Sequence, residues 1–130
     1  MAGDREADPL GLQLHRPGRG RMVLYVTGEL DRLTAPMLVV FLAHRLGGDA
    51  PDTNLTIDLT ATSFVDIGGL NALLEVQRRA RLDGVTVHVG ACRAQFLLLL
   101  RATGTTGLIA PAPGRPRFYR ARGCRPSGGR

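Results

Sequence analysis

The stretch LTIDLTATSFVDIGGLNALL, residues 55–74, joins a strand pattern to a helix pattern. It opens with Leu55–Leu59 (LTIDL), a short run that is typical of a β-strand. Residues 64–69 (FVDIGG) form a turn, and a helix is predicted from Leu70 to about Leu82. Four residues of this helix are expected to face the core: Leu70, Leu73, Leu74 and Ala80. A strand that leads into a helix is typical of layered α/β domains.

Two further strands are predicted upstream, joined in a hairpin. Residues 10–15 (LGLQLH) place three leucines on one face, which is typical of a strand whose other face is exposed. Residues 22–27 (MVLYVT) are apolar and rich in β-branched and aromatic residues, which also indicates a strand. Residues 17–20 (PGRG) supply the turn between them.

A first helix is predicted after the hairpin. Thr34 is expected to cap it, Pro36 lies in its first turn, and Gly47 and Gly48 follow its last residue. Its core stripe comprises Leu38, Phe41, Leu42 and Leu46, and a second face comprises Met37, Val40 and His44. That second face has two interpretations: contact with a partner protein, or a helix sandwiched inside its own domain.

The rest of the domain continues the alternation of strands and helices. Asp83-Gly84 ends the second helix, Val85–Val89 forms a strand, and Arg93–Ala102 forms a short helix that Gly104 stops. Leu108-Ile109 closes the domain. The order β-β-α-β-α-β-α implies right-handed crossovers in an α/β domain. We expect a mixed four- to five-stranded sheet, covered mainly on one face by three to four helices.

The net charge of +6 is concentrated at the C-terminal end. Residues 111–130 hold six arginines and no acidic residue, whereas the other 110 residues hold 11 arginines and 11 acidic residues. We predict a flexible leader over residues 1–9, one domain over 10–110 and a disordered tail over 111–130. The tail is either loosely attracted to nucleic acid or an acidic partner, or an unselected tail of an arginine-rich proteome. The chain has no lysine, which favours the second interpretation, so no specific nucleic-acid partner is expected.

Nothing in the sequence predicts catalysis. Cys92 and Cys124 form no metal-binding pair, and the three scattered histidines (His15, His44 and His88) suggest no catalytic arrangement. Cys92 is expected in the core. Without lysine the chain has no P-loop. The N-terminus lacks the features of a signal peptide, and no apolar run is long enough to span a bilayer. We therefore expect a cytoplasmic protein without membrane insertion, enzyme activity, metal site or cofactor.

Three stretches resemble the STAS family, named for sulfate transporters and anti-sigma factor antagonists. VLYVTGELDRLTAP, residues 23–36, resembles the family's strand, GELD turn and opening helix. Residues 55–74 resemble its buried strand, D-x-x-G-L turn and following helix. FLLLLRATGTTGLIA, residues 96–110, resembles its leucine-rich helix before a T-G-L turn. The motifs occur in the family's order over roughly residues 10–110, so the resemblance implies the STAS fold.

The resemblance also implies a function. Bacterial antagonists of this family bind an anti-sigma factor, often a serine kinase with a histidine-kinase-like ATPase fold, and thereby release a sigma factor. In the usual cycle the kinase phosphorylates a serine directly before the Gly-Leu of the turn, and the added charge blocks binding. In this chain the acceptor position is Gly68, which has no hydroxyl, and Ile67 does not supply one. The usual switch is therefore expected to be absent.

The missing acceptor leaves several interpretations open. The protein is a permanently competent antagonist controlled by its abundance, a member of a complex regulated elsewhere, or a relative that no longer acts on a kinase-type anti-sigma factor. The alternative function is an accessory or scaffold STAS subunit of a stress-signalling or lipid-transport complex. Thr60, Thr62 and Ser63 lie upstream of the turn but do not align with the family's acceptor. A monomer or weak homodimer is expected.

The resemblance implies a partner-binding site at the two helix starts: Asp31, Thr34, Asp66, Ile67, Gly68, Gly69, Leu70 and Asn71. Asp66 has an alternative role as N-cap of the second helix, and Asp31 and Thr34 have one as turn and cap. Gly68 and Gly69 either admit a partner's backbone or fit a tight turn. Leu70 is assigned mainly to the core, and Asn71 to surface contact.

Overall fold

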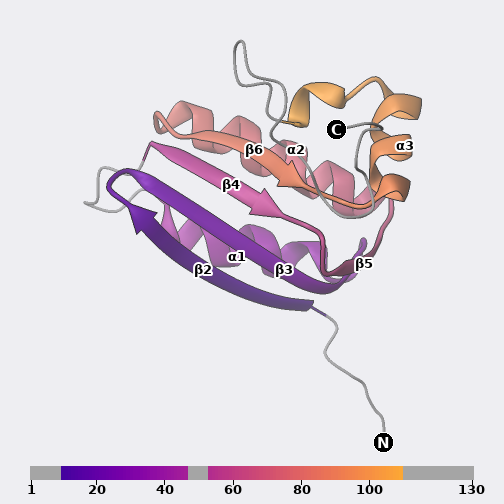
Figure 1. Ribbon diagram of the computed structural model, residues 1–130, viewed down its shortest axis with the longest axis horizontal. Helices are drawn as coiled ribbons and strands as arrows, with labels where there is room; N and C mark the ends of the chain where they lie inside the picture. The colour runs from indigo at the N-terminus through magenta and orange to yellow at the C-terminus, as the bar shows by residue number, and fades with distance from the viewer. Residues whose placement is uncertain (1–9, 47–52, 110–130) are drawn as a thin grey trace, which may run out of the picture.

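The computed structural model describes residues 10–46 and 53–109 (Figure 1). Its strands are β2 (Leu10–Gly18), β3 (Arg21–Leu30), β4 (Asn54–Asp58), β5 (Thr62–Val65) and β6 (Thr86–Ala91). Its helices are α1 (Ala35–Arg45), α2 (Ile67–Leu82) and α3 (Ala94–Thr103), followed by the short 3-10 helix η1 (Thr106–Leu108). The predicted α/β class is confirmed.

The sheet is mixed, with strand order β2-β3-β4-β6 and β5 paired to β3. β2 and β3 form the predicted antiparallel hairpin. The first half of β3, Arg21–Tyr25, pairs in parallel with β4, and its last three residues, Gly28–Leu30, pair in parallel with β5. β6 pairs in parallel with β4. β5 thus continues the line of β4 along β3, and β3, β4, β5 and β6 all run in the same direction.

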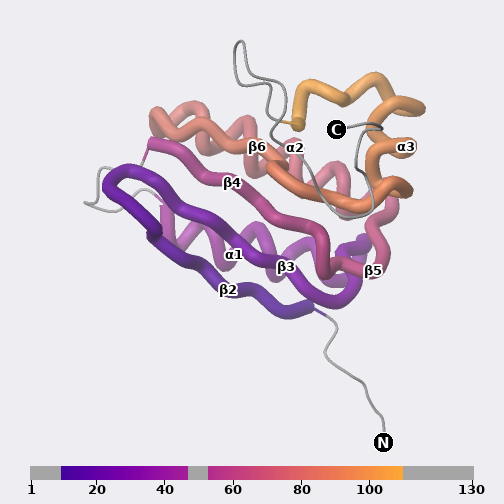
Figure 2. Tube along the Cα trace, in the orientation of Figure 1, coloured from indigo at the N-terminus to yellow at the C-terminus, as the bar shows by residue number. Residues whose placement is uncertain are grey.

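The two long helices cover one face of the sheet. Figures 1 and 2 show α1 and α2 side by side behind the strands, with α3 beyond the end of β6. Strand side chains that point toward these helices are buried, as Leu24 and Ile57 illustrate, whereas Tyr25 on the other face is exposed. The core therefore lies between the sheet and α1 and α2, and coverage mainly on one face is confirmed.

Several sequence predictions need correction. Residues 62–65 were not expected to form a strand, but they are extended and pair with β3 as β5. The second helix begins at Ile67 rather than Leu70. The interpretation of α1 as a helix sandwiched in its own domain is wrong, because Met37 and Val40 are exposed. Cys92 is buried in the core as expected.

Other predictions lie partly outside the described residues. The leader, residues 1–9, the glycines after α1 and the tail, residues 111–130, are among them, as is Cys124. No helix within residues 10–46 and 53–109 is long and apolar enough to cross a membrane. In the same ranges, no group of three or more His, Cys, Asp or Glu side chains could hold a metal ion.

Candidate protein-docking site

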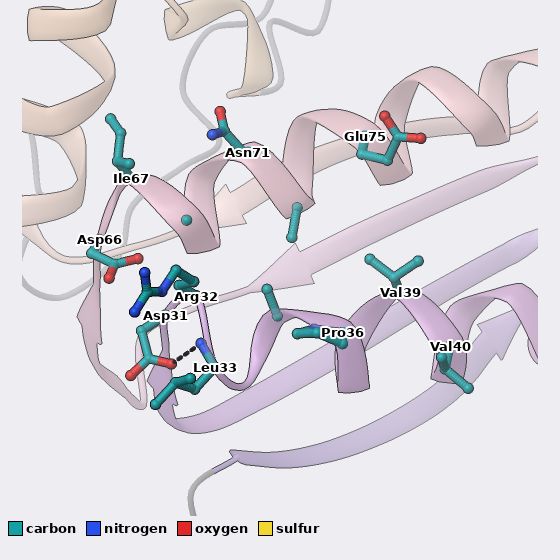
Figure 3. A pocket seen from close by; sticks show the side chains of 13 residues that line it. Asp31, Arg32, Leu33, Pro36, Val39, Val40, Asp66, Ile67, Asn71 and Glu75 are labelled. Carbon is teal, nitrogen blue, oxygen red and sulfur yellow. Dashed lines mark hydrogen bonds between the residues drawn. The ribbon is translucent and has the colours of Figure 1, made fainter.

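The beginnings of α1 and α2 enclose a groove. It has a volume of about 960 Å³ and is open to solvent (Figure 3). Five of the eight predicted partner-binding residues line it: Asp31, Asp66, Ile67, Gly68 and Asn71. The other lining residues are Arg32, Leu33, Ala35, Pro36, Val39, Val40, Ala72 and Glu75. Thr34, Gly69 and Leu70 do not line it.

Asp66 caps α2 and thereby sets the position of the groove wall. Its side-chain Oδ1 accepts a hydrogen bond of 2.9 Å from the backbone N–H of Gly69. Its own N–H donates to the carbonyl of Leu30 at 3.3 Å, which ties the helix start to the end of β3. The N-cap role predicted as one alternative for Asp66 is confirmed, and the cap explains why α2 starts at Ile67.

Asp31 and Thr34 organise the turn before α1, which is the turn role predicted as one alternative. The Asp31 carboxylate accepts hydrogen bonds from the N–H groups of Leu33 and Thr34, at 2.9 and 3.0 Å. The Thr34 hydroxyl accepts from the Asp31 N–H at 3.0 Å and donates to the Glu29 carbonyl at 2.8 Å. Thr34 occupies the N-cap position of α1 as predicted, but its hydroxyl makes no cap hydrogen bond to the helix. Because Thr34 is buried, it supports the turn from inside.

Gly68 and Gly69 allow two segments of the same chain to pack closely. A Cβ atom added to Gly68 would lie 2.8 Å from the Cα of Arg32, and one added to Gly69 would collide with the carbonyl group of Leu30. Neither glycine has a positive φ, so a left-handed turn does not explain them. The close approach that they permit is made by residues 30–32 of this chain. Contact of these glycines with a partner stays a prediction.

Three large apolar residues that line the groove, and Met37 beside them on α1, are exposed. Leu33 is 77% exposed, Val40 55%, Ile67 51% and Met37 46%. We call these four residues the docking surface. Ile67 was among the predicted contacts, and Met37 and Val40 belonged to the second face of the first helix. Leu33 was missed, although an apolar residue in a polar turn just before a helix is a usable signal. Leu70 is buried in the core and Asn71 is exposed, as expected.

One charged residue of the groove, Glu75, is held by arginines of its own helix. Arg79 and Arg78 each contact the Glu75 carboxylate at 2.8 Å, and these hydrogen bonds lower the pKa of Glu75. The histidines lie elsewhere: His15 packs edge-on to Tyr25, and the ring of His44 meets the carbonyl of Val40. Desolvation by burial lowers the pKa of His88, which lies on β6. The described groups with a shifted pKa are thus a salt-bridged carboxylate at the groove and a partly buried histidine on β6.

Comparison with protein families gives one match. A family model described as "Mlab, STAS domain" matches residues 15–110, which is most of the chain. No curated protein matches the chain at a significant level.

Comparison with solved structures shows the same fold. The anti-sigma factor antagonist SpoIIAA in its unphosphorylated form is 16% identical, with a TM-score of 0.65 over 77% of this chain and 86% of that one. An anti-sigma factor antagonist from Mycobacterium paratuberculosis is 24% identical, with a TM-score of 0.64 over 77% of this chain and 82% of that one. The murine Solute Carrier 26 family member A9 anion transporter is 19% identical, with a TM-score of 0.60 over 67% of this chain but only 14% of the transporter.

Proposed function

This chain belongs to the STAS domain family, and from that membership we propose that it is an anti-sigma factor antagonist, a binding protein and not an enzyme. It binds an anti-sigma factor of the serine-kinase type through the docking surface and so releases a sigma factor in the cytoplasm. The observation that carries the proposal is the combination of an open groove and four exposed apolar side chains at the starts of α1 and α2. Exposed apolar side chains around an open groove are typical of a site that binds another protein.

The surface is suited to binding because its backbone is held from within. Asp66 ties α2 to β3, and Asp31 and Thr34 bind each other's backbone in the facing turn. The backbone that carries Leu33 and Ile67 is therefore held before a partner arrives, which reduces the entropy lost on association.

The usual serine switch is absent from this surface. The acceptor position is Gly68, and its Cα lies against the backbone of Arg32. We propose that the unmodified protein is competent to bind and that Gly68 takes no part in regulating it.

A second candidate function is an accessory STAS subunit of a stress-signalling or lipid-transport complex. The family model named for Mlab and the match to one domain of a large anion transporter favour this alternative. An accessory subunit would present the same docking surface to a scaffold or transporter subunit instead of to a kinase.

Binding experiments with purified components would distinguish an anti-sigma factor antagonist from an accessory STAS subunit. Each kinase-type anti-sigma factor of the source organism would be titrated calorimetrically with the full chain, and each complex then challenged with its sigma factor. A one-to-one complex that excludes the sigma factor supports the antagonist. If no such kinase binds and a tagged chain instead co-purifies stably with transporter or scaffold subunits, the accessory function replaces it. Removal of residues 111–130 should leave binding unchanged, because we assign the tail no role in docking.

A further inference from the structure

We propose that Ser63 is a phosphate-accepting residue of this chain, an inference that rests on the proposed binding of a serine-kinase anti-sigma factor. Three hydroxyl groups precede the docking turn, and their surroundings differ. Thr62 is buried, and its hydroxyl donates to the Val26 carbonyl at 2.7 Å. The Thr60 hydroxyl donates to the Asp58 carboxylate at 2.6 Å, so a phosphate there would face a like charge. Ser63 is exposed, and its hydroxyl donates only to the Gly28 carbonyl, at 3.1 Å.

The backbone around Ser63 is also accessible to an enzyme. β5 is an extended strand of four residues, and in the described part of the chain it pairs only with β3. No strand of the described residues pairs with its other edge, and an extended edge is the conformation in which a strand can be bound by another protein. A kinase held at the neighbouring docking surface would therefore meet a substrate segment that is already extended.

One basic side chain, Arg93, lines the same cavity as Ser63 and could pair with a phosphate on it. Ser63, Arg93 and Gln95 line one cavity of about 270 Å³ between β5 and the start of α3. The Nε–H of Arg93 donates to the Thr60 carbonyl at 2.9 Å, which anchors the guanidinium and leaves its two terminal nitrogens without a hydrogen bond to the described residues. A guanidinium with free N–H groups pairs strongly with phosphate oxygens. The first turn of α3 holds no acidic residue that would oppose the charge.

The step is an ordinary phosphoryl transfer from ATP. The Ser63 oxygen forms a bond to the γ-phosphorus, the bond from that phosphorus to the bridging β–γ oxygen breaks, and ADP leaves. The hydroxyl proton passes to the catalytic base of the kinase. The product carries about −1.5 to −2 charges at neutral pH.

Phosphorylation of Ser63 would weaken docking by adding charge beside the docking surface. Phe64 follows Ser63 and is half exposed, and Ile67 of the docking surface lies three residues further on. A phosphate paired with Arg93 would place negative charge and bound water beside these apolar side chains. We expect phosphorylated chain to bind the anti-sigma factor at least about tenfold more weakly than the unmodified chain.

The kinase reaction gives the first test. The full chain and the anti-sigma factor that binds it are incubated with labelled ATP, and the label is located by mass spectrometry in wild type, Ser63→Ala and the control Thr60→Ala. Label on Ser63, lost only in Ser63→Ala, supports the proposal. A kinase that binds the unmodified chain but labels another residue, or none, overturns it. A kinase that does not bind at all contradicts the proposed function instead.

A second test needs no kinase. Phosphoserine is introduced at position 63 during translation, and its phosphate is titrated by phosphorus NMR in the full chain, with and without Arg93→Gln. Pairing with Arg93 should lower the phosphate pKa by roughly half a unit or more relative to the Arg93→Gln protein. An unchanged pKa, or a chain that unfolds when Ser63 carries phosphate, would show that the cavity does not accept the group.

Discussion

The Cα of Gly68 lies against the backbone of Arg32, so closely that a Cβ atom would stand 2.8 Å from the Arg32 Cα. This packing joins the first turn of α2 to the turn before α1, and it leaves no room for a serine at the family's acceptor position. Restoring that serine would therefore disturb the docking site before any kinase could act on it.

The Gly68→Ser variant should be destabilised. Crowding of this kind costs about 1–3 kcal/mol, because the Arg32 backbone must shift. Urea unfolding would measure the loss, with Gly107→Ser as control, since nothing lies within 4 Å of a Cβ at Gly107. If Gly68→Ser were as stable as wild type, the described close packing would be incorrect.

Most of the fold could be predicted because its strands and helices carry strong local patterns. The hairpin, α3 and its stop at Gly104 follow from alternation, leucine content and glycine position. β5 was missed because its four residues make a strand only by pairing with the distant segment Gly28–Leu30. Pairing of this kind depends on tertiary structure, which local sequence patterns do not report.

The candidate site was predicted less completely, for a related reason. Asp66 was recognisable as a cap from its place before a helix. The sequence does not show which distant residues pack against the start of a helix. The contact of Gly69 with Leu30 and the burial of Thr34 were therefore not predicted. Leu33 was overlooked because exposure depends on how the turn is oriented.

Two replacements of Asp66 should separate the contribution of its capping hydrogen bond to stability from the contribution of its charge. Asp66→Ala removes the acceptor for the Gly69 N–H and should lower the free energy of unfolding by about 1 kcal/mol. Asp66→Asn keeps an acceptor oxygen and should retain most of that stability. Chemical unfolding of both variants checks the prediction, and an equal loss in the two would mean that the charge, not the hydrogen bond, stabilises α2.

His88 should make the stability of the fold sensitive to mild acid. Burial lowers the pKa of His88 below its usual value of 6.5, so the unfolded chain binds a proton more readily than the folded chain. The stability is then fully present above the unfolded pKa and is lost as the pH falls toward the folded pKa. Melting temperatures of wild type and His88→Gln, compared at about pH 7.5 and pH 5, measure this effect. The drop on acidification should be smaller in His88→Gln, and parallel drops would exclude His88 as its source.

Leu33 offers the sharpest test of the docking surface, because the chain contains a matched control. Leu33 beside the groove and Leu82 at the far end of α2 are both 77% exposed, so replacement of either by serine should change stability by less than about 0.5 kcal/mol. Burial of a leucine against a partner contributes roughly 1.5–3 kcal/mol, which corresponds to about a tenfold or greater loss of affinity on removal. Calorimetric titration with the anti-sigma factor should therefore show weaker binding for Leu33→Ser and unchanged binding for Leu82→Ser. Equal affinities for the two variants would place the interface away from the starts of α1 and α2, whereas a loss confined to Leu82→Ser would place it at the opposite end of α2.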